Sequence, residues 1–300
     1  MFKKGDVICF FGDSITANGL WIAEVYQNVR KICPVKCYNV GVAGATAERA
    51  SLYLHKKCLS LNPDWVVMMF GINDIRYSLY SEGLKNDEQT ESLKKAALLS
   101  HKSAYEYLVK ETVDSGAKVI LATPTPYDDV NEKEEENLRC QSGLDECVVY
   151  LKKLAEKYNC HVVDFKTVMQ PMLSERDILS KDRIHPTPIG HHVMAQIFLN
   201  DVGIKANPDF DSPFVWDEWN RERYDAEQEL TLVNFIEYNV LLKEGYKDML
   251  SYEARKKIAE ERYEEYEDKT GFFPRAYKEY LDKIDRYEQY TADIIKRTIL

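Results

Sequence analysis

The pattern that most constrains this chain is a short apolar run that ends at a glycine and leads into a helical segment. The first run covers residues 7–11 and ends at Gly12. A later run, over 65–70, ends in the same way at Gly71, and the predicted strand over 35–40 ends at Gly41. Unbroken apolar runs of this length are typical of strands buried on both faces, as in parallel sheets. The pattern therefore predicts strands and helices that alternate around a parallel sheet.

Five strands are expected, with helices between them. The expected strands cover residues 7–11, 35–40, 65–70, 118–123 and 161–165, and the clearest helices cover 88–115, 133–158 and 188–199. Parallel strands joined by helices build an α/β fold in which helices cover both faces of the sheet. We therefore expect a flavodoxin-like three-layer sandwich with a five-stranded, mostly parallel sheet.

The alternation of strands and helices stops near residue 205. Pro208 and Pro213 then indicate a linker, and apolar residues recur at helical spacing through the rest of the chain. Eight of the ten net negative charges also lie beyond residue 200. The sequence therefore predicts two parts, an α/β domain over 1–204 and a helical extension of unknown role over 205–300.

The composition argues against several classes of protein. The chain has 40 basic and 50 acidic residues, a net charge of −10, which disfavours nucleic acid as a partner and provides no polybasic membrane anchor. We find no apolar run of membrane-spanning length and no secretion signal. Seven cysteines, an odd number without such a signal, indicate reduced thiols and a cytoplasmic location.

Small or polar residues follow the ends of the first three predicted strands. These residues are Ser14, Gly44 and Asn73, and His185 lies in a loop after the fifth strand. Because the carboxyl ends of parallel strands meet at one edge of a sheet, we expect these four residues to lie close together.

Ser14 can act as a nucleophile only beside a base, because a serine hydroxyl is weakly nucleophilic at its free pKa. Of the six histidines, we favour His185, which lies in a loop with an acid three residues earlier and a proline after it. At this spacing Asp182 can accept a hydrogen bond from one ring nitrogen and leave the other to face Ser14. The alternatives are a helix N-cap for Ser14 and a simple loop turn for residues 182–186.

A serine nucleophile also needs donors for the oxyanion of the tetrahedral intermediate. Ser14 lies at a strand-to-helix turn, where backbone N–H groups have no helical partner. Gly44 allows close approach to its backbone, because it has no side chain. Asn73 offers an amide that donates at any working pH. Its alternative role is that of a turn residue.

The blocks that carry these residues resemble those of the SGNH/GDSL hydrolase family. They are Gly12 to Thr16, Gly41 to Thr46, Gly71 to Asp74 and Asp182 to Pro186, in the family's order. The resemblance covers about residues 5–200 and implies Ser14 as nucleophile, His185 as base and Asp182 as the residue that orients the base. It also implies an oxyanion hole made by the N–H groups of Ser14 and Gly44 and the side chain of Asn73.

We therefore expect a cytoplasmic serine esterase that acts through an acyl-enzyme and needs no cofactor. The expected substrate is a small-molecule ester, with acetyl or another small acyl group on a carbohydrate or similar polar alcohol. Trp21 lies close behind Ser14, where its ring could flank a sugar, and Asp13 and Asp74 are further expected substrate-binding residues. No residue set has the spacing of metal ligands, so no metal is expected.

Three other functions remain open. Within the same class, the chain could be a lysophospholipase or a thioesterase. From another class, it could be a non-catalytic binding or scaffold protein that uses the acidic extension as its interaction surface. A phosphatase or phosphodiesterase is less favoured, because that chemistry usually needs a metal or a cationic clamp. The apolar stretch over 230–242 also leaves open a homo-oligomer formed through the extension.

Overall fold

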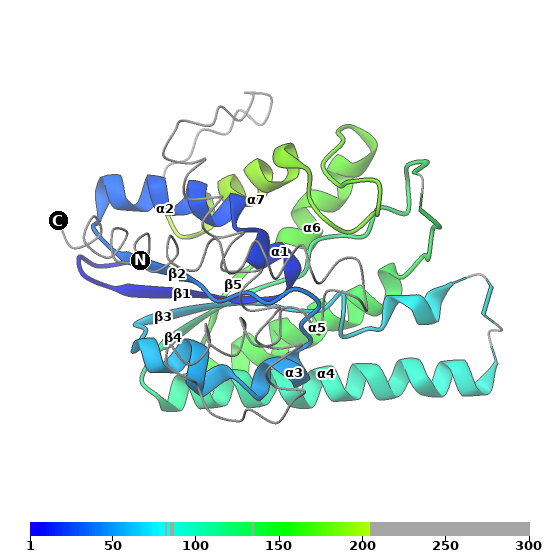
Figure 1. Ribbon diagram of the computed structural model, residues 1–300, viewed down its shortest axis with the longest axis horizontal. Coiled ribbons are helices and arrows are strands. Elements are labelled where there is room, and N and C mark those ends of the chain that lie inside the picture. Colours follow the sequence, from blue (N-terminus) through cyan, green and yellow to red (C-terminus); the bar gives the residue numbers. More distant parts are fainter. Residues whose placement is uncertain (82, 85–86, 134, 205–300) are drawn as a thin grey trace, which may run out of the picture.

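The computed structural model of the chain describes residues 1–81, 83–84, 87–133 and 135–204. The strands within them are β1 (Val7–Gly12), β2 (Lys36–Asn39), β3 (Trp65–Met69), β4 (Lys118–Ala122) and β5 (His161–Val163). Neighbouring strands are parallel, in the order β2-β1-β3-β4-β5 (Figure 1). This is the flavodoxin-like order, so the predicted fold class is confirmed. The predicted extension over 205–300 lies outside the described residues.

Helices cover both faces of this sheet and complete the three layers (Figure 1). One face carries α1 (Ser14–Asn18), α2 (Leu20–Ile32), α6 (Phe165–Met169) and α7 (Pro188–Asp201). The other carries α3 (Ala47–Ser51), α4 (Glu88–Asp114) and α5 (Gln141–Tyr158). The three inner strands, β1, β3 and β4, are mostly buried on both faces, which explains their apolar runs, whereas the edge strands β2 and β5 are only partly buried.

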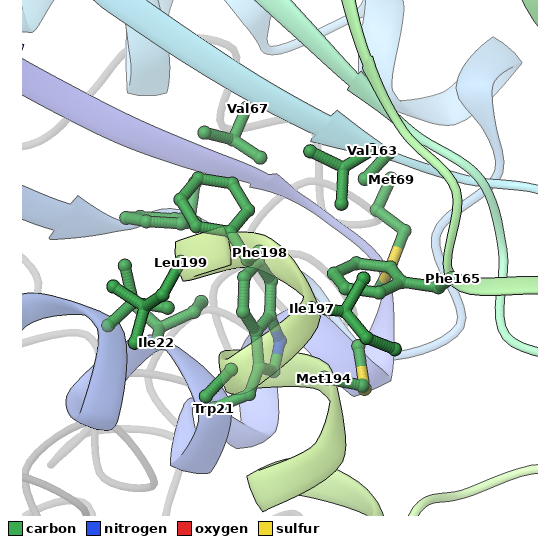
Figure 2. Close-up of a cluster of buried hydrophobic side chains, with 14 of the residues drawn as sticks. Trp21, Ile22, Val67, Met69, Val163, Phe165, Met194, Ile197, Phe198 and Leu199 are labelled. Carbon is green, nitrogen blue, oxygen red and sulfur yellow. The ribbon is translucent and has the colours of Figure 1, made fainter. Parts of the chain in front are cut away.

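Each face of the sheet has its own hydrophobic core. The core under α2 and α7 is centred on Trp21, Phe165 and Phe198, which Figure 2 shows packed together. The core on the other face includes Phe11 and Tyr105. Burying a large apolar side chain contributes about 1.5–3 kcal/mol, so the two cores hold the sheet edge rigidly in place.

The turn from β1 into α1 requires a glycine at its start. A Cβ on Gly12 would lie 2.1 Å from Thr16 Oγ1 and 2.7 Å from the Met69 carbonyl oxygen. Any side chain at this position would therefore push α1 away from β3. The glycine allows the chain to turn directly from the strand into the helix that begins with Ser14.

One predicted helix differs from the observed one at its start. The helix predicted over 133–158 begins at Gln141, because residues before it form hydrogen bonds elsewhere. The Tyr127 hydroxyl accepts a hydrogen bond from Leu138 N and donates one to the Glu136 carbonyl, both at 3.0 Å. Residues 47–58 form two short pieces, α3 and a π-helical turn, Leu54–Cys58.

The fifth strand is shorter than predicted. β5 ends at Val163, because Asp164 turns the chain and caps α6 by accepting a hydrogen bond from Thr167 N at 3.0 Å. The chain then passes through α6 and a loop before it reaches His185, on the α7 side of the sheet.

Candidate active site

Ser14 is the first residue of α1, but it does not cap that helix. The cap is Asp13, whose Oδ1 accepts a hydrogen bond from Ile15 N at 3.0 Å. The N-cap alternative for Ser14 is therefore wrong, and its half-buried side chain is directed elsewhere. Ser14 Oγ lies 2.8 Å from His185 Nε2. A hydroxyl and an imidazole at this distance can exchange a proton.

The other ring nitrogen of the histidine faces a carboxylate, as the spacing predicts. His185 Nδ1 lies 2.6 Å from Asp182 Oδ2. Asp182 Oδ1 accepts hydrogen bonds from the N–H groups of Ile184 and His185, both at 2.9 Å, and from the Ser180 hydroxyl at 2.7 Å. Residues 182–186 are thus a loop turn, and this turn also holds the His185 ring in a fixed orientation.

These contacts shift the pKa values of both Asp182 and His185. Burial raises the pKa of the Asp182 carboxyl, but hydrogen bonds from His185, Ile184 and Ser180 outweigh it and hold that pKa well below its ordinary value. The hydrogen bond to Asp182 raises the pKa of His185 above its ordinary value of 6.5. The pair thus favours a charged imidazolium, which is the species that forms when the histidine takes a proton from serine.

Arg183, between these two residues, is a part of the site that the sequence did not reveal. It is 5% exposed and has a left-handed backbone, with φ at +68°. Its guanidinium donates to the backbone carbonyls of Asp128 at 2.8 Å, Asn131 at 2.7 Å and Glu135 at 2.8 Å. Arg183 thereby anchors the Asp182–His185 turn to the segment after β4. The only signal in the sequence was an arginine inside the block itself.

The two other predicted donors lie on neighbouring loops. Gly44 has a left-handed backbone, with φ at +69°, and a Cβ there would contact nothing within 4 Å. Its backbone angle, rather than crowding by the protein, therefore favours glycine. Asn73 lies in the turn after β3, where its carbonyl accepts a hydrogen bond from Arg76 N. Its side-chain Nδ2 also donates to the Ala45 carbonyl at 3.2 Å.

The predicted substrate contact of Trp21 is wrong. The side chain is 1% exposed and lies inside the core, with ring centroids 5.3 Å from Phe10, 5.5 Å from Phe165 and 5.6 Å from Phe198 (Figure 2). Trp21 is on the face of α2 that packs against the sheet, so its ring cannot reach a sugar.

Asp13 and Asp74 were also predicted to bind the substrate, and this prediction is wrong as well, because they are only 2% and 5% exposed. Their carboxylates bind backbone N–H groups, of Ile15 and Ala47 respectively. Burial and, to a smaller extent, the charge of Asp74 outweigh the lowering effect of the hydrogen bond from Ile15 and raise the pKa of Asp13 to about 7. Both acids lie under the site rather than on its surface.

The described residues also bear on metal and membrane binding. Among them, no group of three or more histidine, cysteine or acidic side chains is arranged to hold a metal ion. Each helix in this part of the chain is too short or too polar to cross a bilayer.

The parallel sheet and the contacts among Ser14, His185 and Asp182 are typical of a serine hydrolase. Comparison with known proteins supports the same class. Residues 10–193 match the GDSL-like Lipase/Acylhydrolase family, which is more than half of the chain. The chain belongs to this family, as its sequence blocks predict, and it is a carboxylic ester hydrolase.

The relatives that this chain matches include acetylxylan esterases. An acetylxylan esterase of Geobacillus stearothermophilus is 26% identical over 222 residues, which is 67% of this chain and 96% of the relative. A crystal structure of a catalytic histidine-to-alanine mutant of that enzyme, called Axe2, has a TM-score of 0.57 at 25% identity, over 68% of this chain and 97% of its own. A catalytic serine-to-alanine mutant gives the same values.

A third solved structure is similar in fold alone. BT4096, a gut microbial diltiazem-metabolizing enzyme, has a TM-score of 0.79 at 16% identity, and the match covers 100% of this chain and 95% of that one.

Proposed function

We propose that this protein is a serine esterase that removes acetyl groups from carbohydrate through a covalent acyl-enzyme. The observation that carries the proposal is the 2.8 Å contact between Ser14 Oγ and His185 Nε2, with Asp182 behind the histidine. The similarity to acetylxylan esterase, which spans nearly all of that relative, supports an acetylated carbohydrate as substrate.

In the proposed reaction Ser14 Oγ attacks the ester carbonyl while His185 Nε2 takes its proton. Asp182 holds the Nδ1–H and stabilises the imidazolium. The negative oxygen of the tetrahedral intermediate is met by the N–H groups of Ser14 and Gly44 and by the Asn73 amide. The sugar alcohol leaves with the proton from His185. Water then attacks the acetyl-enzyme by the same route and releases acetate.

The proposal is tested by the pre-steady-state kinetics of p-nitrophenyl acetate hydrolysis. We expect a burst of p-nitrophenol equal to the enzyme concentration, and no burst with Ser14→Ala. Ser174→Ala, at an exposed serine whose hydroxyl donates to the Pro171 carbonyl, is the matched control and should keep the burst. A Ser14→Ala enzyme with more than about a tenth of the wild-type rate would rule out the covalent mechanism.

The nature of the acyl group and alcohol is tested with a substrate series. Rates should be highest for acetate among p-nitrophenyl esters from acetate to palmitate, and acetylated xylose should be deacetylated. A preference for long chains would instead support the lysophospholipase or thioesterase alternative. Hydrolysis of p-nitrophenyl phosphate, lost on chelation, would support a phosphoesterase, and ligand binding without turnover would support a scaffold protein.

The proposal includes a cytoplasmic location. All seven cysteines, which lie within the described residues, are free thiols, and this agrees with a reducing compartment. Cell fractionation tests the location, and light scattering of the full chain tests the homo-oligomer.

A further inference from the structure

A buried ion pair lies behind the proposed oxyanion donors. Asp74 directly follows Asn73, and His101 projects toward it from the middle of α4. His101 Nδ1 and Asp74 Oδ1 are 3.0 Å apart, and the two side chains are 1% and 2% exposed. A buried charge pair carries a large desolvation penalty and contributes little net stability. Its presence beside the site therefore calls for an explanation other than stability.

The pair is connected to both loops that carry the proposed donors. Asp74 Oδ1 accepts a hydrogen bond at 2.8 Å from Ala47 N, at the start of α3 and three residues after Gly44. In the opposite direction, Asn73 Nδ2 donates to the Ala45 carbonyl at 3.2 Å. These two bonds join the loop after β2 to the turn after β3. The Asp74 carboxylate thus supplies one of the two bonds that hold the loops together.

The carboxylate is not fully compensated by hydrogen bonds. Among the described residues Asp74 Oδ2 has no hydrogen-bond partner, and His101 Nδ1 has none of good geometry, so their contact is one of charge. Burial lowers the pKa of His101, but the charge of the Cys147 sulfur when deprotonated, a hydrogen bond to it, and the contact with the Asp74 carboxylate act in the opposite direction and raise that pKa. The buried Asp74 carboxylate, 3.0 Å from Nδ1, thus favours the positively charged form of the imidazole.

The charge of Asp74 acts on a group next to the proposed nucleophile. It contributes to the raised pKa of Asp13, the residue before Ser14. A carboxylate whose charge acts over this distance also disfavours the negative charge that develops on the substrate oxygen during attack. A positive charge beside it removes that opposition.

We propose that His101 is a positioning residue for this reaction, whose positive charge compensates Asp74 so that the donors at Gly44 and Asn73 meet the oxyanion unopposed. The proposal rests on the proposed serine esterase mechanism. The proposal gives a role to a second histidine. This residue lies on α4, which covers the sheet face opposite to that of His185.

The test is a charge-compensation cycle with His101→Gln, Asp74→Asn and the double variant. For each we measure kcat and KM for p-nitrophenyl acetate per burst-titrated site, and inhibition by phenylboronic acid, which forms a tetrahedral anionic adduct with serine. His101→Gln should lower kcat about tenfold or more, with KM unchanged and boronate inhibition weakened by a similar factor. The double variant should recover most of this loss, because the amide that replaces the Asp74 carboxylate is neutral and its oxygen can still accept from Ala47 N.

The matched control is Tyr105→Phe. Tyr105 lies one turn along α4, its ring centroid is 5.3 Å from that of His101, and its hydroxyl donates to the Met68 carbonyl at 3.0 Å. This variant disturbs the same buried interface without changing charge, so it should lower the unfolding temperature and keep kcat per site.

The proposal is overturned if the double variant is slower than His101→Gln, or if kcat per site and boronate binding are unchanged in His101→Gln. If that variant does not fold, His101→Asn removes the same charge and takes its place in the cycle. Failure of the serine esterase mechanism would be seen separately, as a wild-type enzyme without a burst or an active Ser14→Ala variant.

Discussion

Ser14 Oγ and His185 Nε2 lie 2.8 Å apart although 171 positions separate them along the chain. The serine is fixed by the tight turn from β1 into α1. The histidine is carried by a loop that closes on itself, with Ser180 N bonded to the His185 carbonyl at 2.8 Å. The contact therefore depends on two supports, the sheet edge and this loop.

The pH dependence of hydrolysis should follow the titration of His185. Only the neutral imidazole can accept the Ser14 proton, so activity should rise with pH through the pKa of His185. The hydrogen bond to Asp182 raises this pKa above 6.5, and the midpoint of kcat/KM should lie above 6.5 as well. In Asp182→Asn the residual activity should have a lower midpoint. Rates measured from about pH 5 to 9 test both statements; an unshifted midpoint in the variant would contradict them.

Asn73→Ala should lower kcat by roughly 10²–10³, the usual cost of one oxyanion donor, with a small change in KM. Asn73→Asp should be at least as harmful, because a carboxylate would repel the oxyanion. Steady-state kinetics on p-nitrophenyl acetate separates the two constants. A rise in KM alone would mean that Asn73 binds the substrate in its ground state.

Trp21→Phe should destabilise the protein without affecting the reaction. The smaller ring leaves part of the core between α2 and α7 unfilled, at a cost of roughly 1–3 kcal/mol in the free energy of unfolding. Urea denaturation measures that cost, and KM for an acetylated sugar should equal the wild-type value. A raised KM with unchanged stability would restore the sugar-flanking role that burial argues against.

Arg183→Lys should weaken the anchor of the Asp182–His185 turn. Lysine keeps the charge but lacks the planar fork that reaches three carbonyls at once. We expect a loss of about 2–3 kcal/mol in the free energy of unfolding, because buried acceptors lose a charged donor. Arg76→Lys is the matched control, since Arg76 also has a left-handed backbone, with φ at +52°, but is exposed. Equal losses in the two variants would contradict the anchoring role.

A chain that ends after residue 204 should still hydrolyse p-nitrophenyl acetate with the kcat of the full chain. Each residue proposed to act in the reaction lies within 1–204. Burst titration of the shortened and full chains makes the comparison, and light scattering shows whether their oligomeric states differ. A shortened chain that is folded but inactive would place part of the catalytic machinery in 205–300.

The sheet and the position of the site could be predicted because both depend on local patterns. Strands buried on both faces are unbroken apolar runs, and the residues after Gly12, Gly41 and Gly71 must lie at one edge of a parallel sheet. The distance between Asp182 and His185 was predictable for a similar reason, since only a short turn separates them. The assigned roles of these residues stay predictions until the variants are measured.

Burial and long-range partners could not be predicted in the same way. Trp21 near the start of a helix fits a core face or a cleft equally well, and its neighbours Phe165 and Phe198 are far away in sequence. His101 has no sequence neighbour that signals a charge pair, because its partner Asp74 follows a different strand. The Arg183 side chain donates to backbone carbonyls, which every residue type carries, so no pattern of side chains reveals its partners.

Because the Arg183 side chain bonds to backbone carbonyls, the segment after β4 can vary widely in sequence. Arg183 recognises the path of the backbone between Asp128 and Glu135 and not its side chains, several of which are exposed, including Val130, Glu132 and Glu135. Substitutions at these exposed positions leave the support of the histidine intact. Randomising them, while Asp128 and Asn131 are kept, should therefore leave turnover unchanged.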